Sequence, residues 1–411
     1  MILHLDGDGF FAACELLRRR DLRGKPVVVG EERGIATAMN QEAKKAGIVR
    51  GMPIFQIREL HGNAVAVVPS HFDLYEHISQ NCYTILKKYS PIVERYSIDE
   101  CFVDLFHVAE SDVVTYVTKI QKEILASLGV TYSCGIGRTK ALAKLGSKHK
   151  KPYGLTYIPE ERETAFLETI SVHDVWGIGR ALGPKLQQRG IYTARAFRDA
   201  TRNALDGLDV KGVLELQDEL RGYNRFTINP TRDYQKSVES TRSFGSYSKE
   251  RSFVFSELSK NVEVVSERMH DLKVAGVHAS IFLKTALGRR YAECDLPHHT
   301  QDPRILIRSI EPLFNSLYKA GTAYKATGIT IHRCIPTSLV PNDLFGENAT
   351  YLDTSNRISE AVQKLKGLYG TSIVMLGSSL RSTEYRSKRR EDRDSHDPYI
   401  YGLPLPYLGE I

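Results

Sequence analysis

Acidic residues interrupt the most apolar segments of the sequence at two places that lie far apart in the chain. Asp6 follows the segment MILHL, and Asp99 and Glu100 stand inside IVERYSIDECFVDLF, residues 92–106. Both segments have the short, β-branched and aromatic composition of strands. A carboxylate beside a hydrophobic core is costly unless a cation neutralises it. If the two strands are neighbours, the three carboxylates converge and require a counter-cation; the alternative for each acid is an exposed turn at a strand end.

The ligand chemistry of such a cluster favours magnesium. Carboxylates without nearby His or Cys suit Mg²⁺, for which Mn²⁺ can substitute. The six cysteines are far apart and form no CxxC pair, so we expect reduced thiols and not a zinc site. Two hard cations about 3.5–4 Å apart can activate an attacking hydroxyl and neutralise a leaving pyrophosphate. The acids therefore predict a two-metal nucleotidyl transferase.

The length of 411 residues predicts about two to four domains. Strand and helix patterns alternate up to about residue 160, which is typical of an α/β fold. After that come a mostly helical segment (161–229), a linker (230–237), a βαββαβ pattern (238–337) and a polar, partly disordered tail (338–411). One predicted helix, at 71–89, should begin at the capping residue Ser70.

Charge and hydropathy bear on the partners and the location of the protein. The net charge of +7 modestly favours polyanionic partners. No stretch approaches the roughly 18 apolar residues that cross a bilayer, and MILHLDGDGF lacks the features of a secretion signal. We therefore expect no membrane association. The expected location is the cytoplasm of a bacterium or archaeon, or the nucleus in a eukaryote.

Two segments have the composition of phosphate-binding elements. RTKALAKLGSKHKK, residues 138–151, contains six Lys or Arg and no acid, although a solvated helix face is the alternative. In VWGIGRALGPKLQQRGI, Gly177 and Gly179 stand between two predicted helices in the form of a helix-hairpin-helix. The backbone N–H groups of such a turn, together with a cation such as Lys185, would bind DNA phosphates independently of sequence.

Taken together, these motifs resemble the Y-family DNA polymerases, in the branch that contains bacterial polymerase IV (DinB) and its archaeal relatives. The resemblance rests on LDGDGFFA, KPVVVG, NQEAKKAGI, YSIDECF, CGIGRTKALAKLGSKHKKP and WGIGR, in this order, and covers about residues 1–345. It implies a right-hand architecture, with a palm (1–9 and 72–160), fingers (10–71), a helical thumb (161–229) and a little finger (238–337). The implied activity is low-fidelity translesion synthesis by a monomer on primer-template DNA with dNTPs.

The resemblance assigns roles to the acids and to the aromatic residues that follow them. Asp6, Asp99 and Glu100 match the metal-binding carboxylates of the family, and Gly7 would add its backbone carbonyl; Asp8 is not a family ligand. Phe11 matches the bulky residue beneath the sugar of the incoming nucleotide, where a ribose 2′-OH would clash. Phe10 is placed with the nucleotide-binding residues, with a core position as the alternative.

The triphosphate site departs from the family pattern. Where the family usually has Tyr and Arg, this chain has Gln41 and Lys44. Lysine keeps the charge but cannot form the bidentate hydrogen bonds of arginine. The departure from the family therefore implies weaker or differently arranged binding of the triphosphate. Lys151 matches a third triphosphate ligand, with a plain surface lysine as the alternative.

Two further features concern fidelity and a clamp. Ile35 and Thr37 would lie over the nascent base pair. The region from Phe11 to about residue 71 is too short for a long closing helix, which predicts weak testing of base-pair geometry and room for damaged bases. Leu344 and Phe345, in SLVPNDLFG, match a clamp-binding peptide without its leading Gln, and the C-terminal GLPLPYLGEI is a second candidate.

Two other classes of protein would share some of these features. A nucleotide cyclase on a similar palm would have the carboxylates but would not need a DNA-binding hairpin. A catalytically silent paralogue would bind DNA or a clamp, but the complete acidic set argues against it.

Overall fold

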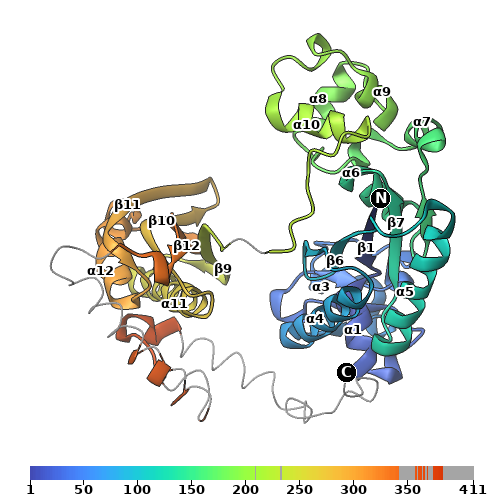
Figure 1. Ribbon diagram of the computed structural model, residues 1–411. Helices are drawn as coiled ribbons and strands as arrows, with labels where there is room; N and C mark the ends of the chain where they lie inside the picture. Colours follow the sequence, from blue (N-terminus) through green and yellow to red (C-terminus); the bar gives the residue numbers. More distant parts are fainter. Residues whose placement is uncertain are drawn as a thin grey trace. The chain divides into compact units, whose positions relative to one another are not determined.

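The computed structural model of the protein (Figure 1) describes residues 1–208, 210–231, 234–341, 357–358, 360–362, 364–365, 368 and 374–382. The chain divides into two compact units at residues 232–233. Each unit has its own sheet and its own hydrophobic core. Within the described residues, no helix has the length and apolar character needed to cross a membrane.

The first unit is built around a five-stranded sheet in the order β5-β6-β1-β7-β8. Its strands are β1 Ile2–Gly7, β5 Val93–Arg95, β6 Glu100–Asp104, β7 Tyr132–Gly137 and β8 Leu155–Tyr157. All neighbours are antiparallel except β7 and β8. The central strand β1 is buried along its whole length, although its sequence ILHLDG includes the polar residues His4 and Asp6.

Different helices cover the two faces of this sheet. One face carries α1 Phe10–Arg18, α4 Phe72–Tyr89 and α5 Val113–Leu128, which share a core with Leu3 and Leu5. On the other face lies α6 Lys140–His149, where Ala143 packs with Ile2 and Phe102. The side chains of β1 therefore alternate between two helical layers.

A glycine in β7 lets α6 lie close to the sheet. A Cβ atom at Gly135 would lie 2.0 Å from the carbonyl oxygen of Ala143 and 2.2 Å from the backbone nitrogen of Ser147, both in α6. We predict that Gly135→Ala lowers the free energy of unfolding by about 3 kcal/mol, because these backbone atoms move only if the helix shifts. Urea denaturation measures this change.

The control for that variant is Gly212→Ala in α10 (Val210–Leu220), where an added Cβ meets nothing within 4 Å. Alanine there should leave the stability unchanged or raise it, because alanine is the better helix former. A cost at Gly135 no larger than at Gly212 would show that the close approach of α6 does not depend on the glycine.

Residues between α1 and α4 form a small sheet with two short helices. The strands are β2 Val27–Val29, β3 Ala38–Met39 and β4 Ala66–Val68, in the order β3-β2-β4, and the helices are α2 Gln41–Lys45 and α3 Ile54–His61. Asn40 caps α2, because its side-chain oxygen accepts the N–H of Ala43 at 3.0 Å.

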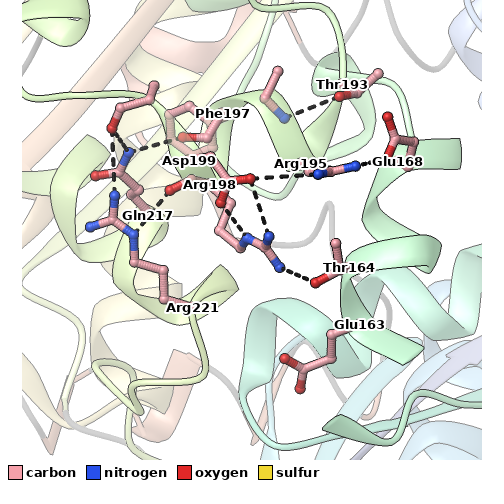
Figure 2. Close-up of polar contacts among 12 residues, drawn as sticks. Glu163, Thr164, Glu168, Thr193, Arg195, Phe197, Arg198, Asp199, Gln217 and Arg221 are labelled. Atoms are coloured by element: carbon pink, nitrogen blue, oxygen red, sulfur yellow. Dashed lines mark hydrogen bonds and ion pairs between the residues drawn. The ribbon is translucent and has the colours of Figure 1, made fainter. Parts of the chain in front are cut away.

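The last part of the first unit is helical, with α7 Glu160–Thr169, α8 Leu182–Gln188, α9 Ala194–Asp199 and α10. Figure 2 shows the polar contacts that join these helices: Arg195 pairs with Glu168, and Arg198 donates to the Thr164 hydroxyl at 3.0 Å. Arg221 donates to the carbonyl of Arg198 at 3.0 Å. These arginines therefore stabilise the fold of the segment.

The second unit is a four-stranded antiparallel sheet, in the order β11-β10-β12-β9, with two helices. In chain order its elements are β9 Ser237–Ser248, α11 Arg251–Asp271, β10 Val274–Thr285, β11 Gly288–Thr300, α12 Pro303–Leu317 and β12 Tyr324–His332, followed by the short β13 Ile335–Pro336. Both helices and the sheet contribute to one core. The predicted βαββαβ order is therefore present.

One local prediction was wrong. Helix α4 begins at Phe72 with no side-chain cap, and the hydroxyl of Ser70 is buried without a hydrogen-bond partner, so Ser70 does not cap the helix. The Gly-Ile-Gly segment lies between α7 and α8, with the 3-10 turn Val172–Asp174 before it. The domain boundaries named from the sequence stay predictions.

Candidate active site

The sheet places the acidic residues of the sequence at neighbouring positions. β1 and β6 are adjacent and antiparallel, and Asp6 lies directly opposite Glu100. The backbone N–H of Gly7 donates to the carbonyl of Asp99 at 2.9 Å, which fixes the turn before β6 against the end of β1. Directly opposed residues of antiparallel strands have Cα atoms about 4.5–5.5 Å apart. The three acids therefore stand together on the backbone.

Their side chains are held by other groups of the same unit. Glu100 accepts from the Lys144 ammonium at 2.6 Å, Asp6 accepts from Lys151, and Asp99 accepts from the Ser97 hydroxyl at 2.6 Å. Among the described residues, no three His, Cys, Asp or Glu side chains form a group that could hold a metal ion. In this arrangement lysines neutralise two of the carboxylates.

Asp6 is a buried carboxylate whose charged form is poorly solvated. Burial raises the pKa of Asp6 above its ordinary value, Lys151 opposes that rise, and the nearby Glu100 and Asp99 add to it. The donor set of carboxylates and a backbone carbonyl is the set that Mg²⁺ and Mn²⁺ prefer. The acids also already require positive charge. The chemistry of this donor set therefore suits divalent ions, whereas the side chains as placed, with two of them on lysines, form no metal-binding group among the described residues.

The aromatic residues after Asp6 divide between core and surface. Phe10 is 3% exposed and packs in the core, which is the alternative to a nucleotide contact that the sequence left open. Phe11 is half-buried and stacks on Tyr75, with 4.5 Å between ring centroids. The Tyr75 hydroxyl donates to the buried carboxylate of Glu15 at 2.5 Å. Sequence reasoning missed Tyr75 and Glu15, although an acid on the apolar face of a helix was a usable signal.

The predicted triphosphate ligands come from helix α2 and from the loop after α6. Gln41 and Lys44 lie on α2, half-buried and exposed respectively, whereas Lys151 contacts Asp6 directly. Ile35 is 43% exposed and Thr37 donates its hydroxyl to the carbonyl of Val29, so only Ile35 offers a large free surface. The structure brings Lys151 to the acids and leaves Gln41 and Lys44 on the small sheet's helix.

The glycine-rich turn precedes α8. Gly177 has φ of +87°, which favours glycine, and the carbonyl of Gly179 accepts the N–H of Gly183 at 2.9 Å. Lys185 is exposed on α8. Leu344, Phe345 and the C-terminal GLPLPYLGEI lie outside the described residues.

Comparison with known protein families decides the family. The model of the impB/mucB/samB family matches residues 5–148, and the model of that family's C-terminal domain matches residues 235–344. The chain belongs to the Y family of DNA polymerases. The matched ranges include the acids of the first unit and the sheet of the second unit.

Individual Y-family relatives agree with this assignment. DNA polymerase IV of Streptococcus agalactiae is 29% identical over 345 residues, which cover 80% of this chain and 93% of the relative. DNA polymerase IV 1 of Bacillus subtilis is 28% identical over 402 residues, covering 94% and 95%.

Solved structures support the right-hand fold of the Y family. A Y-family DNA polymerase chimera has a TM-score of 0.73 at 22% identity, covering 82% of this chain and 99% of that one. DinB from Sulfolobus solfataricus has a TM-score of 0.53 at the same identity and coverage.

Proposed function

We propose that the protein is a template-directed DNA polymerase that adds deoxynucleotides to a primer 3′ end at Asp6, Asp99 and Glu100. The observation that carries the proposal is the register of β1 with β6, which sets Asp6 opposite Glu100 and ties Gly7 to Asp99. The three carboxylates and the Gly7 carbonyl would hold two Mg²⁺ ions, for which Mn²⁺ can substitute. Bound there, the ions would lower the pKa of the primer hydroxyl and neutralise the triphosphate.

The protein's own residues orient the nucleotide around that centre. Lys151 is already beside Asp6, so its ammonium can turn to a triphosphate that arrives at the same place. Gln41 and Lys44 would complete the triphosphate contacts from α2. Phe11, held by its stack on Tyr75, would present a rigid ring to the sugar and exclude a 2′-OH.

Low fidelity and lesion bypass would follow from the small size of the predicted fingers, residues 10–71, which would lie over the nucleotide. Their helices α2 and α3 contain only 5 and 8 residues. Such short helices enclose a base pair weakly, so differences in pair geometry change the transition-state energy little. A damaged template base would be tolerated for the same reason.

DNA binding by the turn at Gly177 and Gly179 predicts a specific salt response. Lys185→Ala should weaken primer-template binding and lower the slope of log K against log[salt] by about 1, because one phosphate contact is lost. No ion pair holds Lys185 within the described part of the chain. Fluorescence anisotropy over a salt series measures the slope.

The matched control for this salt response is Arg195→Ala. Arg195 belongs to the same helical segment but is already paired with Glu168. Its slope should stay that of the unmodified protein. Equal slopes for the Lys185 variant and the unmodified protein would remove Lys185 from the DNA contacts.

Three further expectations belong to the proposal. The protein is a monomer, it is located in the cytoplasm, and it binds a sliding clamp through Leu344 and Phe345. Size-exclusion chromatography with and without a sliding clamp tests the first and the third.

Primer extension tests the proposed activity against its rivals. With primer-template DNA, Mg²⁺ and the four dNTPs, we expect extension that follows the template, including bypass of an abasic site. Nucleotide consumption without DNA would favour a cyclase. DNA binding without any extension would favour a catalytically silent paralogue.

A further inference from the structure

A buried lysine, Lys144, forms an ion pair with Glu100, one of the proposed metal ligands. The side chains of Lys144 and Glu100 are 7% and 17% exposed, and the ammonium lies 2.6 Å from the carboxylate oxygen. A buried ammonium is costly unless it is paired. Among the described residues, Glu100 is the only acid with which Lys144 forms an ion pair.

Two aromatic rings hold the ammonium of Lys144 in place. It lies 4.5 Å from the ring centroid of Tyr96 and 5.6 Å from that of Trp176. The two rings meet edge to face, with 5.5 Å between centroids. Cation–π attraction would keep the Lys144 ammonium between these rings even when Glu100 turns to another cation. We call these three residues, Lys144, Tyr96 and Trp176, the lysine cage.

The lysine cage adjoins the glycine-rich turn through Trp176. Trp176 directly precedes Gly177, and its ring also packs on Phe226 and Phe102. Phe102 lies on β6, two residues after Glu100. Trp176 therefore adjoins the turn proposed to bind DNA along the chain, and its ring contacts the strand that carries a proposed metal ligand.

We infer that Lys144 is a positioning residue, an internal counter-ion of Glu100 that a divalent ion displaces. The displacement moves the Lys144 ammonium relative to the ring of Trp176, which directly precedes the glycine-rich turn. The inference rests on the proposed metal role of Glu100. The ion pair of Lys144 with Glu100 lowers the affinity for the first divalent ion, because that ion must break the pair in order to bind. The ion pair with Lys144 also holds the Glu100 carboxylate in place before the ion arrives.

Mn²⁺ binding tests the competition directly. Lys144→Met keeps the length of the side chain and removes the charge, so the complex with primer-template DNA and a non-hydrolysable dNTP should bind Mn²⁺ about tenfold or more tightly, as measured by electron paramagnetic resonance. The control Lys148→Met removes an exposed charge one turn later in α6 and should change the affinity little. Unchanged or weaker Mn²⁺ binding by the Lys144 variant would overturn the inference.

Glu100→Gln separates this inference from the proposed function. If that variant binds Mn²⁺ as tightly as the unmodified protein, Glu100 is no metal ligand and both fail. If it binds Mn²⁺ more weakly while Lys144→Met shows no gain, only the counter-ion role fails.

The fluorescence of the unmodified protein gives a second test that does not depend on a variant folding. Trp176 is the only tryptophan of the chain. Adding Mg²⁺ to the complex with DNA and a non-hydrolysable dNTP should change the emission, because the ammonium beside the indole moves. Emission that stays constant while the metal binds would contradict the exchange.

Discussion

Replacing Asp6 by asparagine is expected to lower the single-turnover rate of primer extension by about three orders of magnitude. A catalytic metal contributes several kcal/mol to the transition state, and each 1.36 kcal/mol is a factor of ten. The amide keeps the shape of the side chain but not the charge that balances a divalent ion. DNA binding should persist, because Asp6 lies in the sheet and not in the turn at Gly177. Rapid-quench kinetics with labelled primer gives the rate.

Asp8→Asn is the matched control for this loss. Asp8 stands two residues away, but its carboxylate accepts from the Ser133 hydroxyl at 2.7 Å and from the N–H of Tyr153 at 2.8 Å. These contacts give Asp8 a structural role. We expect its variant to extend primers at nearly the rate of the unmodified protein. Equal losses at Asp6 and Asp8 would point to general damage to the sheet and not to a lost metal ligand.

Phe11→Ala is expected to raise the incorporation of ribonucleotides relative to deoxynucleotides by about tenfold to a hundredfold. Forcing an extra group against a packed ring costs typically 1–3 kcal/mol, and alanine removes that cost. The ratio of kcat/KM for a ribonucleotide and its deoxynucleotide measures the effect. Tyr75 should remain in place, because its hydroxyl is held by Glu15.

The control for sugar selection is Phe55→Ala. Phe55 lies on α3 and is 72% exposed, so its loss should leave the sugar ratio unchanged. If ribonucleotides are excluded equally by the Phe11 variant and the unmodified protein, another residue selects the sugar.

Much of the fold was predictable because its strands and helices have clear periodicity. β1 and β6 each contain a short apolar core, and a helix pattern such as that of α5 has a buried face along its whole length. The order of strands and helices in the second unit followed from the same signals. Ser70 shows the limit of local signals, since a capping residue type was present and yet the helix began two residues later.

The proximity of Asp6 to Glu100 was a conditional prediction, because strand order is a property of the whole sheet. Their partners were less accessible still. The contact of Lys144 with Glu100 depends on α6 lying flat on the sheet at Gly135, and nothing in the basic segment itself distinguishes this lysine from the exposed Lys148. Trp176 joins the site from a separate helical segment. Such contacts arise from packing between elements and have no short sequence pattern.

The most direct test of the metal site is anomalous diffraction from Mn²⁺ in crystals of the protein with primer-template DNA and a non-hydrolysable dNTP. We predict two Mn²⁺ ions about 3.5–4 Å apart, bound by the carboxylates of Asp6, Asp99 and Glu100, with Lys144 and Lys151 released from the acids. Manganese bound elsewhere, with both lysines still paired to Glu100 and Asp6, would contradict the proposed chemistry.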